Sequence, residues 1–258
     1  MADSYHPEMY WDEVAQNIEN RKEGNLIAGD DEPYYRYKRK QFLKVLDGLN
    51  FKNKTVLEIG SGPGGNLHYI HAKGCRKITG VDISGSMISL AKNFLAGKDI
   101  DLFKINGSKL PFDDGAFNIV FTSTVLQHIT DENVLNSLIA EIGRVSNSEI
   151  YLFERIERSI KGHESNLGRP VSYYAALLYK HGFHLVQSKP LPIYASYYAC
   201  GAIRKVFNSK PRKEGEPLSK LSIRLEQLAL PVTAILDKFI PNNRDVTLLH
   251  FSKEAAKP

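Results

Sequence analysis

The chain has 258 residues, of which 42% are hydrophobic and 24% are charged, which suits one globular domain with an elaboration. No apolar stretch reaches the roughly 18 residues of a membrane-spanning helix, and the polar, acidic start predicts no signal peptide. The two cysteines make no disulfide framework. We therefore expect a cytoplasmic protein without a transmembrane segment.

The net charge of +5 is unevenly distributed along the chain. Residues 1–154 hold 17 Lys and Arg against 21 Asp and Glu, a net charge of −4, whereas residues 155–245 hold 15 against 7, a net charge of +8. The basic part could face an anionic substrate or an anionic membrane surface, and a solvated basic face explains it equally well.

Residues 1–50 are predicted to be helical and to precede the main domain. Met1–Asp31 is a helical lead-in, and Tyr34–Leu49 is a second helix that begins after Pro33. In the first segment apolar residues recur at helical spacing, at Tyr10, Trp11, Val14 and Ile18. Tyr10 and Trp11 are therefore either packed on the core or turned toward a ligand.

The segment Thr55–Gly65, TVLEIGSGPGG, is the most informative part of the chain. Its first five residues are β-prone and largely apolar, as in a buried strand of a parallel sheet. Alternate glycines follow at Gly60, Gly62 and Gly64, where the backbone turns with positive φ or a ligand approaches the main chain closely. A glycine-rich turn between a strand and a helix predicts a site for a nucleoside-bearing ligand.

The next predicted strand, Lys77–Ile83, places Asp82 about 20 residues after the glycines, where a carboxylate can accept hydrogen bonds from a ribose diol. NAD and S-adenosylmethionine both fit this pattern. Glu58 favours S-adenosylmethionine because an acid two residues before the first glycine can attract an ammonium group. Pro63 removes one N–H donor, which is unfavourable for a pyrophosphate. The segment Leu110–Thr122, LPFDDGAFNIVFT, favours the same choice.

Taken together, these segments resemble the class I S-adenosylmethionine-dependent methyltransferases that act on small molecules. The matching pieces are VLEIGSGPGG, VDIS, NGSKLPFDDGAFNIVF and TVLQHI, in this order over Val56–Phe153. The resemblance implies an α/β fold, with a Rossmann-like seven-stranded sheet that is mostly parallel and whose last strand is antiparallel. It also implies S-adenosyl-L-methionine as the cofactor and a small-molecule acceptor as the substrate.

The resemblance assigns cofactor-binding roles to a set of residues along this core. They are Tyr10, Trp11, Glu58, Gly60, Gly62, Gly64, Asp82, Ile83, Asn106, Gly107 and Thr122. Asn106 stands where the family usually has an aspartate that accepts a hydrogen bond from the adenine amino group, and its side-chain oxygen can still accept that bond.

His128 and Glu154 are the predicted catalytic residues, and no metal site is expected. His128 follows the fourth strand, Phe117–Thr122, at the end of the sheet where ligands bind, and a histidine can accept the proton of a hydroxyl that is being methylated. The alternative is a structural role at the start of a helix. Glu154 lies behind it, at the end of the fifth strand, Glu149–Phe153.

The chain is predicted to comprise four parts. They are an N-terminal helical lid (1–50), the cofactor-binding core (51–188), a helical insertion (189–244) and the last core strand with the tail (245–258). The insertion separates strands six and seven, Phe183–Ser188 and Asp245–Ser252, and contains a basic stretch, Lys210–Glu216. It also contains an apolar helical face formed by Leu221, Leu225, Leu228, Val232, Ile235 and Phe239, where Pro231 would kink or divide the helix.

The insertion has several interpretations: a cap packed on the core, a homodimer interface, a lid for a bulky or lipid-linked acceptor, or a peripheral membrane contact. The predicted reaction is methylation of a small molecule at a hydroxyl oxygen, with a sugar or a lipid-linked intermediate as acceptor. An N-methyltransferase or macromolecule methyltransferase and a non-catalytic cofactor-binding protein are the alternatives. No nucleic acid is expected, because no recognisable RNA module is present and Thr122–Val125 stands where base methyltransferases have Asn-Pro-Pro-Tyr.

Overall fold

The computed structural model describes residues 6–20, 31–208, 216–241 and 245–253. The main sheet consists of β1 (Thr55–Ile59), β2 (Lys77–Asp82), β3 (Ile100–Lys104), β4 (Phe117–Ser123), β5 (Ser146–Ile156), β8 (Phe183–Pro190) and β9 (Asp245–Lys253). The helices are α1 (Pro7–Glu19), α2 (Pro33–Asp47), α3 (Gly65–His71), α4 (Gly85–Phe94), α5 (Glu132–Val145), α6 (Val171–Tyr179), α7 (Tyr194–Phe207), α8 (Lys220–Leu236) and the single 3-10 turn η1 (Leu126–His128). A small hairpin that was not predicted joins β6 (Lys161–His163) to β7 (Asn166–Gly168).

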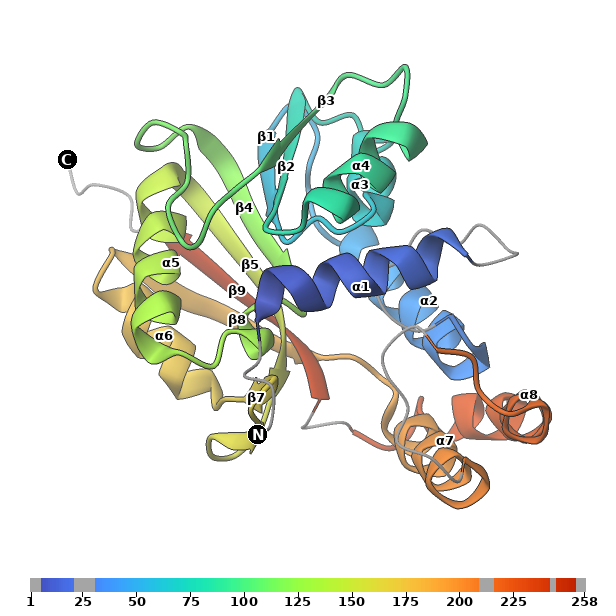
Figure 1. Ribbon diagram of the computed structural model, residues 1–258. Helices are drawn as coiled ribbons and strands as arrows, with labels where there is room; N and C mark the ends of the chain where they lie inside the picture. The colour runs from blue at the N-terminus through green and yellow to red at the C-terminus, as the bar shows by residue number, and fades with distance from the viewer. Residues whose placement is uncertain (1–5, 21–30, 209–215, 242–244, 254–258) are drawn as a thin grey trace.

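The seven strands lie in the order β3-β2-β1-β4-β5-β9-β8 (Figure 1). β1 to β5 run parallel to one another, whereas β9 runs antiparallel to both β5 and β8. The predicted α/β fold with an antiparallel last strand is therefore confirmed. The strand order reverses between β1 and β4, which places a ligand crevice at the carboxyl ends of these strands.

Two hydrophobic clusters cover the two faces of the sheet. Successive strand residues point to opposite faces, so Val56 and Leu57 are both fully buried but belong to different clusters. Helices α5 and α6 pack on the face of Leu57, and α2 and α3 pack on the face of Val56 (Figure 1). α2 is therefore a core helix, although the sequence suggested that residues 1–50 form a lid.

Helix α1 lies across the crevice end of the sheet and packs on α4 (Figure 1). Val14 and Ile18 are buried against Met87 of α4. Asp12 Oδ1 accepts hydrogen bonds from Ser84 Oγ at 2.6 Å and from the Ser86 N–H at 3.1 Å. The predicted helical lead-in is thus confirmed for Pro7–Glu19; residues 1–5 and 21–30 lie outside the described part of the chain.

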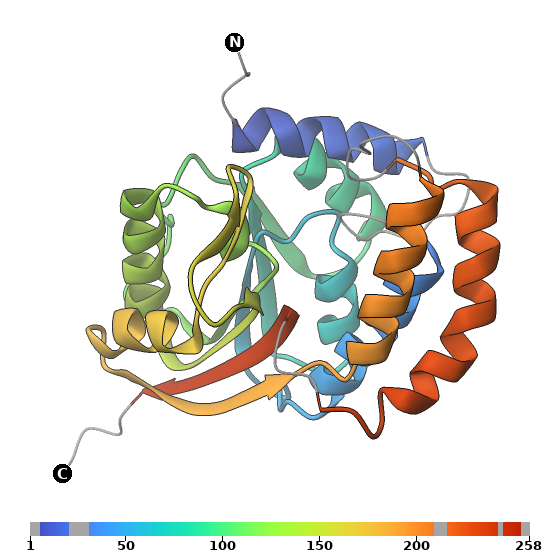
Figure 2. The same cartoon turned by 90° about the horizontal axis from the view of Figure 1, so that it is seen from below.

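The insertion contributes α7 and α8, which lie side by side and next to α2 (Figure 2). It begins after β8, which extends to Pro190 and so takes two residues that were assigned to the insertion. Pro231 was predicted to kink this helix or to divide it in two; α8 continues through Pro231 as one helix, so the helix is not divided. The predicted basic stretch lies outside the described residues except for Glu216. Over the described part of the chain, no helix is long and apolar enough to cross a membrane.

Buried polar contacts connect α8 to α7 and α2. Glu226 is fully buried, and its Oε2 accepts hydrogen bonds from Arg204 Nη2 at 3.2 Å and from the Tyr34 N–H at 3.1 Å. Asp237 is also buried, and its Oδ2 accepts a hydrogen bond from the Tyr37 hydroxyl at 2.9 Å. Buried carboxylates require such donors, so these contacts determine the rotation of α8 about its axis.

Replacement of Glu226 tests this polar interface. Glu226→Ala removes the carboxylate that faces the largely buried guanidinium of Arg204, and we expect the free energy of unfolding to fall by about 3 kcal/mol. The exposed neighbour Gln227 provides the control, because Gln227→Ala should change stability by less than about 0.5 kcal/mol. Urea unfolding measures both. Equal stability of the two variants would contradict a structural role for the Glu226 contacts.

Candidate functional site

A cavity of about 320 Å³ lies at the carboxyl ends of β1 to β4. Its lining comes from the segments that follow these strands, from α1 and from α5. The lining residues are Pro7, Trp11, Ile59, Gly60, Gly62, Asp82, Ile83, Met87, Ile105, Gly107, Ser108, Ser123, Thr124, Val125, His128, Ile129, Thr130, Asp131, Val134 and Leu138. This location matches the crevice expected from the strand order.

The glycine loop forms one wall of the cavity through Gly60 and Gly62. Both have positive φ, +68° and +51°, which side-chain-bearing residues rarely adopt. A Cβ atom on Gly60 would lie 2.3 Å from Cγ2 of Val125 across the loop. A side chain at this position would therefore clash with the wall of the cavity as well as strain the backbone.

Asp82 holds the glycine loop and the start of α4 together. Its Oδ2 accepts the N–H of Gly62 at 2.8 Å, and its Oδ1 accepts the N–H of Ser84 at 2.9 Å. Burial raises the pKa of Asp82, and these backbone hydrogen bonds oppose that effect. Each carboxylate oxygen has a further lone pair, so Asp82, which lines the cavity, can also accept hydrogen bonds from a ligand.

The residues present fit S-adenosylmethionine, the cofactor that the sequence resemblance implies. Asp82 lines the cavity and offers acceptors for a ribose diol. Apolar side chains of Met87, Ile105 and Leu138 offer a surface for an adenine ring. The glycine loop allows a ligand to approach the backbone where a Cβ would fill the space.

Helix α1 closes the cavity with an aromatic side chain. Trp11 lines the cavity and contacts the ring of His128 edge to face, with the ring centroids 5.1 Å apart and an interplanar angle of 90°. Tyr10, its neighbour, packs against Trp11 in the same geometry at 5.2 Å and does not line the cavity. The helix thus places one aromatic residue at the site rather than the two that were predicted.

The hydrogen bonds of His128 determine which of its nitrogens carries the proton. Nδ1 lies 2.9 Å from the carbonyl oxygen of Ser165, which can only accept, so Nδ1 donates. Nε2 lies 3.2 Å from Nε2 of Gln127, whose Oε1 accepts the N–H of Arg155. The amide NH₂ group of Gln127 therefore faces the histidine. Burial lowers the pKa of His128, and the hydrogen bond to Ser165 opposes this effect. Both the lowered pKa and the hydrogen bonds therefore favour a neutral ring with a lone pair on Nε2.

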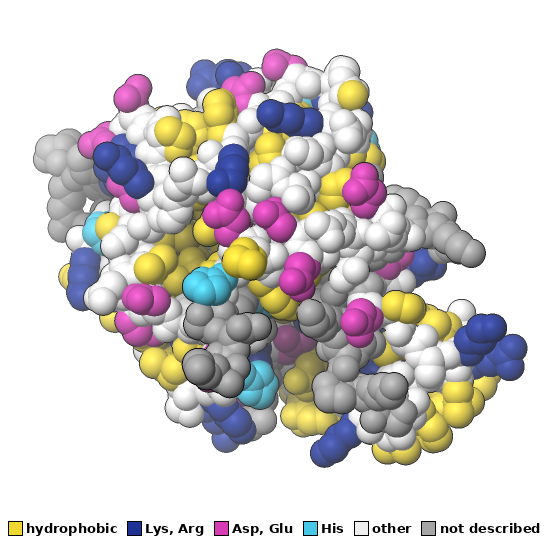
Figure 3. Space-filling model, in the orientation of Figure 1, with side chains coloured by type: hydrophobic (Ala, Val, Ile, Leu, Met, Phe, Trp, Pro, Cys, Tyr) yellow, Lys and Arg dark blue, Asp and Glu magenta, His cyan; other side chains and the backbone are white. Residues whose placement is uncertain are grey.

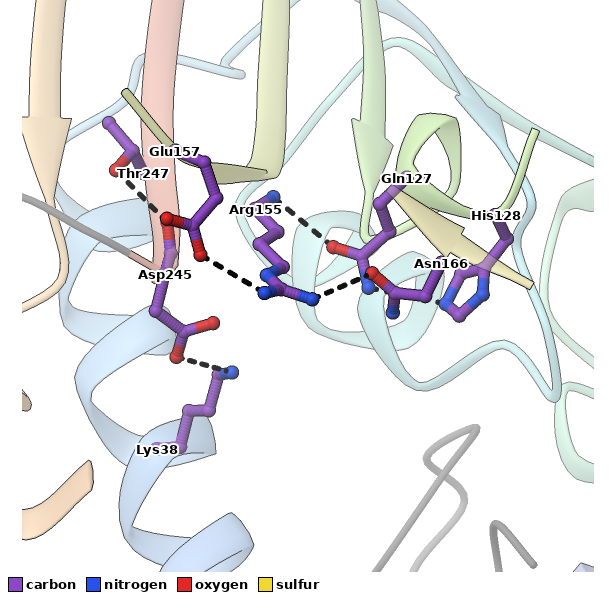
Figure 4. A network of polar contacts seen from close by, with 8 residues as sticks. All are labelled: Lys38, Gln127, His128, Arg155, Glu157, Asn166, Asp245 and Thr247. Atoms are coloured by element: carbon purple, nitrogen blue, oxygen red, sulfur yellow. Dashed lines mark hydrogen bonds and ion pairs between the residues drawn. The ribbon is translucent and has the colours of Figure 1, made fainter. Parts of the chain in front are cut away.

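A strip of polar side chains lies beside His128 (Figure 4), and among the residues drawn there only His128 lines the cavity. Arg155 donates from Nη1 to Asn166 at 3.2 Å and from Nη2 to Glu157 at 3.0 Å. Farther along, Lys38 of α2 pairs with Asp245 of β9 at 2.9 Å. Cations and carboxylates are thus balanced along the strip, which provides a hydrogen-bonding surface beside the histidine.

Glu154 fixes the segment that holds His128. It is fully buried, and its Oε1 accepts hydrogen bonds from Thr122 Oγ1 at 2.7 Å and from the Val125 N–H at 3.2 Å. Its Oε2 accepts the Gln127 N–H at 3.2 Å. Burial raises the pKa of Glu154 to about 7, although these hydrogen bonds oppose the shift. Glu154 does not line the cavity, and these contacts favour a role in positioning His128 over the predicted catalytic role.

Glu58 lies beneath the glycine loop rather than in the cavity. It is 1% exposed, and its Oε1 accepts a hydrogen bond from Asn66 Nδ2 at 2.7 Å. Burial raises the pKa of Glu58 to about 8, and the Asn66 hydrogen bond and the nearby Arg39 guanidinium oppose this. The predicted role in orienting the loop agrees with this contact, which reaches the first turn of α3. The predicted attraction of a ligand ammonium group does not agree with its position outside the cavity.

The cavity brings together seven of the predicted site residues: Trp11, Gly60, Gly62, Asp82, Ile83, Gly107 and His128. Six others lie outside its lining: Tyr10, Glu58, Gly64, Asn106, Thr122 and Glu154. Asn106 is exposed and accepts a hydrogen bond from Lys104 Nζ at 2.9 Å. A Cβ on Gly64 would meet Leu95 of the segment after α4 at 2.7 Å, so this glycine serves packing.

Several lining residues were missed by the sequence analysis. Ser123, Thr124 and Val125 follow the carboxyl end of β4, and Asp131 caps the N-terminus of α5. Thr124 has φ +58°, which is unusual for a β-branched residue and typical of functional sites. The sequence indicated these residues only through their position directly after a predicted strand, because ligands in this fold bind at the carboxyl ends of parallel strands.

Comparison with known sequences agrees with this geometry. Residues 56–149 match the family model described as a methyltransferase domain. The chain is 24% identical over 132 residues to ajmaline N-methyltransferase of Rauvolfia serpentina, covering 49% of this chain and 44% of the relative. It is 34% identical over 91 residues to a ubiquinone/menaquinone biosynthesis C-methyltransferase of Desulfotalea psychrophila, covering 35% and 36%. The chain thus spans less than half the length of these curated relatives.

Solved structures share the fold at low sequence identity. The [4+2]-cyclase SpnF superposes with a TM-score of 0.67 at 14% identity, over 96% of each chain. Magnesium protoporphyrin IX methyltransferase from Synechocystis, solved with bound SAH, superposes with a TM-score of 0.51 at 13% identity, over 86% of this chain and 83% of that one. At such identities the likeness concerns the fold.

The raised pKa of Glu58 predicts a loss of stability as the pH rises. Between the ordinary carboxyl pKa of 4.5 and the folded-state value of about 8, the folded chain keeps a proton that the unfolded chain has released. The free energy of unfolding therefore decreases with pH in this window. Glu58→Gln, which mimics the protonated form, should reduce the slope by up to about 1.4 kcal/mol per pH unit.

Urea unfolding at pH values from about 5 to about 8 measures this slope. Glu19→Gln at the exposed end of α1 is the matched control and should keep the slope of the parent chain. An unchanged slope in Glu58→Gln would mean that Glu58 is ionised in the folded protein.

Proposed function

We propose that this chain, whose residues 56–149 match a methyltransferase domain, is a class I S-adenosylmethionine-dependent methyltransferase that transfers a methyl group to a hydroxyl oxygen of a small-molecule acceptor. When bound, S-adenosylmethionine supplies an electrophilic methyl group on a positively charged sulfur. In this proposal Gly60 and Gly62 receive the methionine side of the cofactor, and Asp82 accepts hydrogen bonds from the ribose. Trp11 shields the reacting atoms from water.

The observation that supports oxygen as the acceptor atom is the hydrogen-bond geometry of His128. A hydroxyl is a weak nucleophile until its proton begins to leave, so a neutral imidazole beside it is useful. Nε2 of His128 carries the lone pair because Nδ1 donates to Ser165. The acceptor hydroxyl would replace the Gln127 amide at Nε2, and Gln127 and Arg155 would then orient its polar groups.

N-methyl transfer is the second candidate, favoured by the similarity to a relative named as an N-methyltransferase. An amine acceptor would also release a proton, which His128 could take. A third outcome, suggested by the cyclase that shares this fold, is a protein that binds the cofactor without transferring its methyl group. Product formation separates these three candidates.

Titration calorimetry followed by an assay of S-adenosylhomocysteine release tests the proposal. We expect the purified protein to bind S-adenosylmethionine and not NAD, and to release product with hydroxyl-bearing acceptors in a panel that also contains amines. His128→Asn can still donate to Ser165 but lacks a basic nitrogen. It should lower turnover by about 100-fold with little change in cofactor affinity.

The pH dependence of turnover tests the role of His128 independently. Turnover should rise with pH up to the pKa of His128, which lies below the ordinary 6.5, and stay level above it. Near-normal turnover of His128→Asn would return this residue to a structural role. Product release with amines alone would favour N-methyl transfer, and cofactor binding without product from any acceptor would favour the non-transferring alternative.

The contact of Asp12 with α4 predicts that α1 retains the bound cofactor. Asp12→Ala removes two hydrogen bonds, from Ser84 and Ser86, that hold α1 over the cavity. We expect affinity for S-adenosylmethionine to fall by about tenfold, mainly through faster dissociation. Asp12→Asn keeps an acceptor oxygen and should therefore lose much less affinity for S-adenosylmethionine. Identical dissociation rates in the parent and Asp12→Ala would show that α1 does not limit release.

A further inference from the structure

Helix α8 exposes apolar side chains and buries polar ones, the reverse of an ordinary surface helix. Its buried side comprises Ser222, Glu226 and Thr233, followed by Asp237 just after the helix. Its exposed apolar side, which we call the outer face, comprises Leu221, Leu228, Val232, Ile235 and Leu236, with Phe239 and Ile240 directly after. Leu228 and Phe239 are 75% and 78% exposed. Such a continuous exposed patch marks an interaction surface.

The outer face cannot turn inward without a large cost in free energy. Glu226 and Asp237 are held by donors from α2 and α7, among them Arg204, Tyr37 and Ser196. Rotation of α8 about its axis would withdraw both carboxylates from these donors. The apolar side chains therefore remain available to a partner.

The charges around the outer face indicate what kind of partner it meets. From the start of α8 at Lys220 to residue 241, every exposed ionisable side chain is a cation, namely Lys220, Arg224 and Lys238, whereas the exposed acid Glu216 lies before the helix. Both acids of this segment are buried. In the space-filling view, apolar side chains gather over α7 and α8, with Lys and Arg at the margin (Figure 3).

We propose that the outer face docks onto an anionic phospholipid bilayer. A helix with an apolar stripe bordered by cations lies flat at the headgroup level, with the apolar side chains in the acyl boundary and the cations near the phosphates. A second copy of the chain is the less suitable occupant, because a two-fold interface across this stripe would bring the same cations together. No described residue of α7 or α8 lines the cavity, so the membrane contact leaves the cavity accessible.

Vesicle flotation tests the proposal without any acceptor or turnover. The full chain should float with vesicles of equal parts phosphatidylcholine and phosphatidylglycerol, and not with phosphatidylcholine alone. Leu228→Gln/Phe239→Gln should weaken binding by at least about tenfold. Tyr179→Gln/Val186→Gln, which changes two residues of similar exposure (65% and 60%) on α6 and β8, should bind as the parent does.

The electrostatic contribution to vesicle binding is tested with a separate variant and with the salt dependence of binding. Lys220→Gln/Lys238→Gln should bind anionic vesicles about tenfold more weakly, and added salt should weaken the parent in the same direction. Circular dichroism and thermal unfolding verify that each variant is folded.

Three results would overturn the proposal. One is absence of flotation with anionic vesicles, and another is equal binding by the parent and Leu228→Gln/Phe239→Gln. The third is a dimer in analytical ultracentrifugation that this double variant converts to a monomer while vesicle binding is absent. That result would assign the outer face to a second copy of the chain. Because none of these readouts uses the cofactor, their failure is separate from failure of the proposed function.

Discussion

The carboxylate of Asp82 connects the parts from which the cavity is built. One of its oxygens accepts the N–H of Gly62 in the loop after β1, and the other accepts the N–H of Ser84. The hydroxyl of Ser84 accepts the N–H of Met87 and donates to Asp12 of α1. A glycine loop, the start of α4 and the helix that covers the cavity thus share one buried anion. Burial disfavours the charge, and the surrounding N–H donors compensate for this.

A second buried carboxylate organises the other end of the cavity. Glu154 accepts hydrogen bonds from Thr122, Val125 and Gln127, and so fixes the turn after β4 against β5. Gln127 in turn presents its amide to His128, whose ring is also held by Ser165 of the β6–β7 hairpin. The orientation of the histidine therefore depends on three segments distant in sequence. These contacts fix the position of the imidazole ring that lines the cavity.

Buried carboxylates also organise the insertion, where they leave an apolar helix face exposed. Glu226 and Asp237 are stabilised by donors on α2 and α7, and satisfying them places polar residues inside and apolar residues outside. Withdrawing a buried carboxylate from its donors costs about 3–5 kcal/mol, which opposes any rotation that would turn the apolar side inward. The resulting exposed face of α8 is a consequence of those contacts and suggests a partner outside the chain.

The sequence by itself determined the strands, most helices, the glycine loop and the position of Asp82, because periodicity, propensity and loop chemistry act over a few neighbouring residues. It also predicted that His128 follows the fourth strand at the ligand-binding end of the sheet, and this residue lines the cavity. Only the tertiary structure decided that Glu58 and Glu154 lie beside the cavity and not in it, that Asn106 turns outward to Lys104, and that the apolar stripe of α8 faces outward. A helical stripe in sequence shows which residues share a face but not which way that face points. Its direction depends on where distant segments place their hydrogen-bond donors, and chain folding alone brings those donors together.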